Sequence, residues 1–175
     1  PERPGDEGAK SGRCLTGGRR GSGGFRPPLP APYPRPPVKN RTFVMCKPDA
    51  VERGLVGEIV ARLERKGLSL VAADLRTVDR ALAEEHYDEH RDKPFFGDLV
   101  DFVTRSPVFP MVVEGPDDNT WLLVRKLVGA TKATEAEPGS IRGDFATVTT
   151  ENLVHASDGH DSAAREMALW FPGLG

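Results

Sequence analysis

The sequence predicts a fold of the α+β class, in which helices cover a four-stranded antiparallel sheet in a ferredoxin-like arrangement. Two observations support this prediction. Four short segments are rich in apolar residues and have the length of strands. Between them, apolar residues recur at spacings of three and four, which is typical of amphipathic helices. The resulting order of strand, helix, strand, helices, strand, helix, strand, helix is typical of an α+β sandwich.

The predicted strands are short and mostly apolar, and they cover residues 42–46, 68–78, 108–113 and 153–155. Pro48 should stop the first strand, because proline lacks the N–H that a strand interior needs, and Lys47 then lies at the strand tip. Pro110 lies inside the third strand and removes one donor from the sheet. The strand pairing should therefore be weakened at that point.

Five helices are predicted, and they cover residues 55–66, 81–90, 97–104, 121–128 and 162–169. The first has the clearest pattern, since Leu55, Ile59 and Leu63 lie on one face and charged residues lie between or after them. Gly67 follows as a C-terminal stop signal. The pattern thus indicates an amphipathic helix that covers the sheet.

The first forty residues differ in composition from the rest of the chain. They hold eight basic and three acidic residues, a net charge of +5, which leaves −7 for the remainder of a chain whose total charge is −2. They are rich in Gly and Pro and contain little to bury, so we expect residues 1–40 to be a disordered extension with polyproline character near its end. Residues 41–175 should form one domain. A native extension or an added leader is favoured over a basic arm for RNA or lipid, or a targeting peptide.

Composition limits the classes of function. The net charge of −2 and the pI near 6.1 provide no global attraction to nucleic acid or to an anionic membrane, and a small-molecule partner fits better. No apolar stretch approaches the ~20 residues of a membrane span, and no secretory signal precedes the domain, so we expect a cytoplasmic protein. Cys14 and Cys46 have neither a disulfide nor a metal-ligand pattern and are interpreted as reduced structural thiols.

His155 is the candidate catalytic residue. It ends the last predicted strand, and Glu166 follows in the last predicted helix, from which its carboxylate could orient the imidazole. A nucleophilic imidazole needs one free ring nitrogen and a partner that holds the other. His86, His90 and His160 lack such neighbours in the sequence and are interpreted as core or surface histidines. The sequence has no GxxxxGKS/T and no GxGxxG motif, so side chains must hold any phosphate.

Three separated motifs carry a resemblance to a known family. Lys47-Pro48-Asp49, the segment PGSIRGDF at 138–145 and the segment NLVHASD at 152–158 resemble those of the nucleoside diphosphate kinases, from about Arg41 to Gly175. The ending at 168–174 is similar to the short bacterial form, in particular that of actinobacteria. The resemblance implies the ferredoxin-like fold and transfer of the γ-phosphoryl group of a nucleoside triphosphate to a diphosphate. The transfer would be ping-pong, through phospho-His155, and would maintain NTP and dNTP pools.

The resemblance also assigns roles to residues that match the family's motifs. It implies catalysis by Lys47, Tyr87, His155 and Glu166, orientation by Ser157, and nucleotide binding by Lys47, Phe95, Leu99, Arg125, Thr131, Arg142 and Asn152. The residues by themselves favour Lys47 and Arg142 and leave Arg125 undecided, since an arginine on a helix is usually solvated. Phe95 would stack on the base with little selectivity, and Leu99 would border it. Phe96 is assigned to the core.

Cofactor and partners follow from the same resemblance. Mg²⁺ is expected to enter with the nucleotide, carried by the phosphates and by water, with no dedicated protein cage. The expected partners are ATP, other nucleoside diphosphates and triphosphates, and further copies of the chain. Family members are usually hexamers, and some bacterial ones are tetramers. Neither nucleic acid nor a membrane is an expected partner.

Some positions depart from the family pattern. Ala156 stands where many members have Gly, residues 105–110 read RSPVFP in place of SGPVVA, and Lys132-Ala133 replaces an Asn-Pro in a loop that helps subunits associate. Residues 147–150 are less apolar than usual. Two other functions stay open: a catalytically weak relative that binds nucleotides or regulates, and an RNA-binding module. The intact motif residues argue against the first, and the absence of a basic sheet with exposed aromatics argues against the second.

Overall fold

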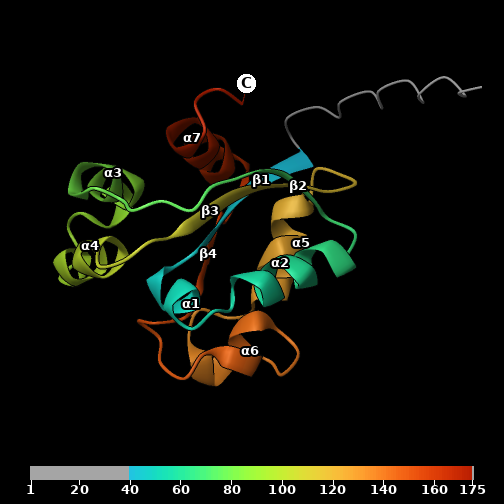
Figure 1. Cartoon of the computed structure of the whole chain (residues 1–175), viewed down its shortest axis with the longest axis horizontal. Helices are drawn as coiled ribbons and strands as arrows, with labels where there is room; N and C mark the ends of the chain where they lie inside the picture. Colours follow the sequence, from blue (N-terminus) through green and yellow to red (C-terminus); the bar gives the residue numbers. More distant parts are fainter. Residues whose placement is uncertain (1–39, 175) are drawn as a thin grey trace, which may run out of the picture. The chain divides into compact units, whose positions relative to one another are not determined.

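The computed structural model describes residues 40–174 (Figure 1). The predicted disordered extension, apart from Asn40, lies outside the described residues, and so does Cys14. Within the described residues, no helix is long and apolar enough to cross a membrane.

One antiparallel sheet organises the domain. Its strands are β1 (Arg41–Cys46), β2 (Ser69–Ala73), β3 (Phe109–Glu114) and β4 (Val154–Ala156), in the spatial order β2-β3-β1-β4. In β1, Arg41 pairs with Glu114 and Cys46 with Phe109, and the same strand pairs His155 of β4 with Met45. The predicted four-stranded antiparallel sheet is therefore confirmed.

Pro110 explains why the second strand is shorter than the predicted 68–78. The Asp74 amide donates to the Pro110 carbonyl at 3.1 Å, so these two residues lie opposite each other where β2 would continue. In such an antiparallel pair the second hydrogen bond would run from the Pro110 amide to Asp74, but proline has no N–H. Regular pairing of β2 ends at Ala73, and Arg76 forms only an isolated bridge with Val108. On its other side, Pro110 lies opposite Met45 within an unbroken register. The proline thus interrupts the outer pairing and leaves the central one intact.

The helices within the described residues are α1 (Pro48–Glu52), α2 (Val56–Arg65), α3 (Arg80–His86), α4 (Phe96–Thr104), α5 (Thr120–Val128), α6 (Ile141–Phe145) and α7 (His160–Trp170), with 3-10 turns at Asp88–His90 and Ala133–Glu135. The predicted helix 81–90 was too long, because α3 ends at His86 and a 3-10 turn follows. Sequence analysis missed α1 and α6, which are too short for an apolar period to develop. Local signals mark both: Pro48 begins α1, and Ser140 caps α6 by accepting from the Gly143 amide.

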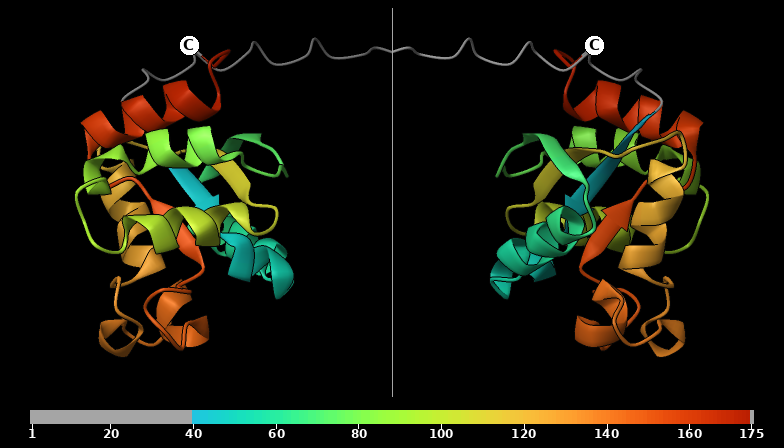
Figure 2. Two further views of the ribbon diagram at one scale, coloured as in Figure 1. Left: turned by 90° about the vertical axis from the view of Figure 1, so that its left-hand side faces the viewer. Right: turned by 90° about the vertical axis from the view of Figure 1, so that its right-hand side faces the viewer.

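Helices cover both faces of the sheet. Because side chains alternate along a strand, Val44 and Cys46 of β1 face one core and Phe43 and Met45 face the other. The first core is closed by α2, α5 and α6, and the second by α3, α4 and α7, so α6 (orange) and α7 (red) lie on opposite sides of the sheet in Figure 2. The ends of β1 and β4 bring residues from both layers to one place.

Candidate active site

A cavity of about 950 Å³ lies where β1 and β4 end. Its walls come from segments far apart in the chain, including Lys47, α4, α5 and the segment before β4. Every site residue predicted from the sequence lines it except Ser157, which lies behind Glu166. His90, interpreted from the sequence as a core or surface histidine, also lines the cavity, and its ring centroid is 5.8 Å from that of Phe95.

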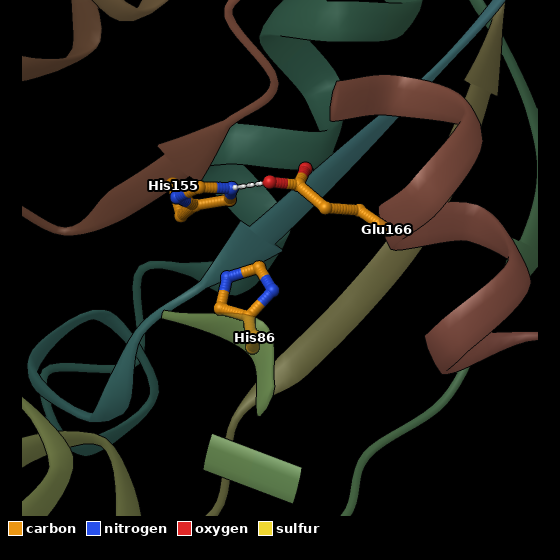
Figure 3. A group of neighbouring side chains, drawn as sticks. All are labelled: His86, His155 and Glu166. Atoms are coloured by element: carbon orange, nitrogen blue, oxygen red, sulfur yellow. Dashed lines mark hydrogen bonds and ion pairs between the residues drawn. The ribbon is translucent and has the colours of Figure 1, made fainter. Parts of the chain in front are cut away.

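His155 lies on β4, and a carboxylate from α7 holds one of its ring nitrogens. Nε2 is 3.0 Å from Oε1 of Glu166, whose side chain is buried (Figure 3). Oε2 of Glu166 accepts from Ser157 Oγ at 2.6 Å. A carboxylate that accepts from both sides requires the His155 proton on Nε2. Nδ1 then has a free lone pair, and no hydrogen bond reaches it from residues 40–174.

An unusual backbone at Leu153 aims the end of β4. Leu153 has a φ of 70°, a left-handed conformation that costs a non-glycine residue about 1–2 kcal/mol. Asp49 Oδ2 accepts from the Leu153 amide at 2.9 Å, and the Leu153 carbonyl accepts from the Lys47 amide at 2.8 Å. Burial raises the pKa of Asp49, whereas Lys47 and the Leu153 amide lower it. Asp49 thus stabilises the turn that places His155, a role that sequence analysis did not assign.

A second histidine lies directly beside the first. The rings of His86 and His155 meet edge to face at 74°, with their centroids 4.5 Å apart, and Glu166 completes a cluster with metal-ligand spacing (Figure 3). Trp170 Nε1 donates to His86 Nδ1 at 3.1 Å. Because an indole N–H can only donate, the proton of neutral His86 is on Nε2. A metal at Nε2 would require the opposite tautomer and the loss of the Trp170 bond, so the cluster is a poor metal site.

Burial explains the state of His86. Its side chain is buried, and this desolvation lowers the pKa well below 6.5, with smaller contributions from His155, Arg165 and His90. His86 is therefore a neutral core histidine, as predicted. Its position against His155 could not be inferred from the sequence.

Four cations line the cavity, namely Lys47, Arg105, Arg125 and Arg142. Burial lowers the pKa of Lys47 to about 8, and Lys47 Nζ lies 3.4 Å from the Thr150 carbonyl and 5.1 Å from the centre of the Phe102 ring. The buried Arg142 donates to the carbonyls of Asn152, Gly129 and Val154. Burial, followed by repulsion from Arg125, lowers the pKa of Arg142 to about 10.

Arg125, which the residues alone left undecided, lies in the cavity wall and donates to the Ala156 carbonyl at 3.3 Å. It is therefore not an arginine of a solvated helix face. The Thr131 carbonyl, also in the wall, accepts from Asn152 Nδ2 at 2.9 Å. These positive charges make the inner cavity suited to a polyanion.

Aromatic residues flank the cavity at different depths. Phe95 is 49% exposed, which leaves its ring available to a planar ligand, and Leu99 lies one helical turn further along α4. Tyr87 is buried, with its ring edge-on to that of His155 at 6.0 Å, and burial raises the pKa of its hydroxyl so that the proton is retained. Phe96 is half-buried and packs against the second core, as predicted.

The cavity thus joins an oriented imidazole, a group of cations and an exposed aromatic face. Residues 40–174 match the nucleoside diphosphate kinase family. The chain belongs to this family. It is 57% identical over 134 residues to the nucleoside diphosphate kinase of Frankia casuarinae, a match that covers 77% of this chain and 96% of the relative. It is also 55% identical over 139 residues to that of Corynebacterium diphtheriae, with 78% and 100% coverage.

Solved structures of the family agree with the fold. The chain is similar to a halophilic nucleoside diphosphate kinase from Halobacterium salinarum in complex with CDP, with a TM-score of 0.72 and 53% identity over 75% of this chain and 86% of that one. A family protein from Babesia bovis also has a TM-score of 0.72, with 51% identity over 75% of this chain and 88% of that one. The predicted family, fold class and phosphotransferase activity are confirmed.

Proposed function

We propose that the enzyme works by ping-pong transfer through His155. The observation that carries the proposal is the asymmetry of the His155 ring, which lines the cavity: Glu166 holds Nε2 at 3.0 Å, while Nδ1 has no hydrogen bond from residues 40–174. The Nδ1 lone pair attacks the γ-phosphorus of a nucleoside triphosphate, and the bond from that phosphorus to the β-γ bridging oxygen breaks. The diphosphate leaves with the bond electrons. A second diphosphate then takes the phosphoryl group, which restores the imidazole.

The cations would hold the transferred group in line. In phosphoryl transfer most of the catalysis comes from position and electrostatic stabilisation. Lys47, Arg125 and Arg142 line the inner cavity, and Thr131 lies in the same wall. We assign these four residues to the phosphates. Tyr87 keeps its proton and can donate a hydrogen bond next to His155.

Asn152 is suited to the sugar. Its Nδ2 is fixed on the Thr131 carbonyl, while its buried Oδ1 has no hydrogen-bond partner among the described residues. A buried acceptor without a partner is costly, and a ribose hydroxyl would satisfy it. The exposed ring of Phe95, bordered by Leu99, would stack on the base. Stacking distinguishes bases weakly, so broad nucleotide specificity is expected.

The residues also fit an Mg²⁺ ion that arrives with the nucleotide. Within residues 40–174, His86, His155 and Glu166 form the only group with metal-ligand spacing, and two ring nitrogens with one carboxylate do not suit an ion that prefers octahedral oxygen ligands. We therefore assign the ion to the phosphates and water. Bound there, it would neutralise charge on the β- and γ-phosphoryl oxygens.

Two expectations stay predictions. Assembly into hexamers or tetramers would be tested by native mass spectrometry, and a cytoplasmic location by cell fractionation. Neither affects the chemistry proposed for a single subunit.

Labelling tests the proposed mechanism. The protein is incubated with γ-labelled ATP and Mg²⁺ and quenched in base, which preserves phosphohistidine. We expect label on the wild type, no label on His155→Ala, and transfer of the label to added GDP or CDP. Nucleotide binding without labelling would overturn the proposal and favour a nucleotide-binding protein.

A further inference from the structure

An ion network at the rim of the cavity has no part in the mechanism above. Arg105, just after α4, donates from Nε and Nη2 to the two carboxylate oxygens of Glu52 at 3.0 and 2.7 Å. Its Nη1 donates to Glu151 Oε1 at 2.6 Å, and Ser106 Oγ donates to Glu52 Oε1 at 2.6 Å. Arg105 and Ser106 stand where the family pattern usually has Ser and Gly. The departure noted in the sequence therefore forms a specific contact.

The network joins three separate segments. Glu52 ends α1, Arg105 follows α4, and Glu151 precedes β4. A single exposed ion pair stabilises little. A guanidinium that donates two hydrogen bonds to one carboxylate and a third to another carboxylate has a defined geometry. Arg105 thus tethers the segment 150–152 to the cavity wall.

That segment contacts groups assigned to the nucleotide. The Thr150 carbonyl accepts from Lys47 Nζ at 3.4 Å, and the Asn152 carbonyl accepts from Arg142 Nε at 3.2 Å. Residues 147–150 are exposed and irregular, so their own packing restrains the segment little. A displacement of Glu151 would shift its neighbours on both sides.

Phe102 provides a second connection to Lys47. The Arg105 guanidinium carbon lies 4.7 Å from the centre of the Phe102 ring, and Lys47 Nζ lies 5.1 Å from the same centre. Arg105 therefore borders the ring against which Lys47 is placed.

We propose that Arg105 is a positioning residue that tethers the segment 150–152 and thereby holds Lys47 and Asn152 in place for the bound nucleotide. This inference rests on the proposed function. The alternative is that Arg105 binds the nucleotide directly as an anion site. All three of its nitrogens are already engaged by carboxylates, which neutralise its charge.

Glu52 separates these two possibilities by the sign of its effect. Glu52 does not line the cavity, so its side chain acts on the nucleotide only through Arg105 and Ser106. If Arg105 tethers the segment 150–152, Glu52→Gln weakens nucleotide binding. If Arg105 is an anion site, the same substitution releases its charge and strengthens binding.

The experiment measures kcat and KM for an acceptor diphosphate, at low and high NaCl, for the wild type and for Arg105→Gln, Arg105→Lys and Glu52→Gln. The matched control is Glu84→Gln, because Glu84, like Glu52, is a carboxylate held by an arginine, and neither Glu84 nor its partner Arg80 lines the cavity. Thermal unfolding of each variant checks that it is folded.

At low salt we expect KM to rise about three- to fivefold in Arg105→Gln and Glu52→Gln, the effect of losing a weak ion network, with kcat within about twofold of the wild type. Lysine lacks the two-pronged geometry, so Arg105→Lys should not restore KM. The difference should shrink at high NaCl, where the network is screened.

A KM that falls in Glu52→Gln, or that Arg105→Lys restores, would overturn the tethering role of Arg105 and establish an anion site. An unchanged KM in Arg105→Gln, or an equal rise in Glu84→Gln, would also overturn it. Failure of the proposed function would instead appear as a wild type that never acquires label on His155.

Discussion

His86 and His155 are the same residue type in contact with each other, yet the structure gives them opposite roles. The ring of His86 is buried, and Trp170 donates to its Nδ1. The ring of His155 reaches the cavity, and Glu166 holds its Nε2 while Nδ1 is free. The difference teaches that the partners of the two ring nitrogens, rather than the residue type or its neighbourhood, decide which imidazole is a nucleophile.

The largest expected effect comes from removing the His155 side chain. His155→Ala should lower kcat by at least about 10⁴-fold, because His86 cannot replace the lost nucleophile. The matched substitution is His86→Asn, whose amide oxygen can still accept from Trp170. Steady-state kinetics and base-stable labelling check both variants. Residual labelling of His155→Ala would show that His86 is reached by the nucleotide.

The next effect acts on the group that orients the ring. Glu166→Gln should lower kcat by about 10²-fold, since an amide can donate to Nε2 and move the proton to Nδ1, where the lone pair is needed. Glu64→Gln, an exposed change on α2, is the control and should leave kcat unchanged. Single-turnover phosphorylation measures the step. Equal rates for Glu166→Gln and the wild type would remove Glu166 from the mechanism.

Burial lowers the pKa of Lys47, as it lowers the pKa of His86, but Lys47 is a proposed site residue, so its titration should affect activity. Because burial lowers the pKa of Lys47 to about 8, its positive charge is present below pH 8 and is lost as the pH rises through that value. We expect kcat/KM to fall about tenfold per pH unit above 8, to the extent that the charge is required. The pH profile of Lys47→Arg should lack this fall, since arginine stays charged. A wild-type profile that is flat to pH 10 would contradict the role of Lys47.

The smallest effect concerns stability. The pKa of His86 is lower in the folded state than in the unfolded state, so below about pH 6.5 the unfolded state binds a proton that the native state does not. The free energy of unfolding should then fall by up to about 1.4 kcal/mol per pH unit as the pH drops below 6.5. Urea unfolding of the wild type and His86→Asn between pH 5 and 7 measures this slope. The slope should be shallower in the variant, and identical slopes would show that His86 is not the titrating group.

The sequence by itself determined the fold class, the longer elements and most of the residues that we propose as the site. Periodic apolar residues located α2, α4 and α5, since a helix that covers a sheet must present one apolar face. Motif residues such as Lys47, Arg142 and His155, which the sequence predicts as site residues, line one cavity. These predictions held because the information lies in neighbouring residues and in short motifs.

Only the tertiary structure decided the features that depend on contacts between distant segments. The second strand ends early because Pro110 of another strand lacks the donor that Asp74 would need. Leu153 adopts a positive φ because the side chain of Asp49 accepts from its amide. His86 is neutral because folding buries its ring, and Trp170, 84 positions away, fixes the tautomer by donating to Nδ1. Such contacts form between residues that the chain keeps apart, so no local pattern records them, and folding alone brings their hydrogen bonds and charges together.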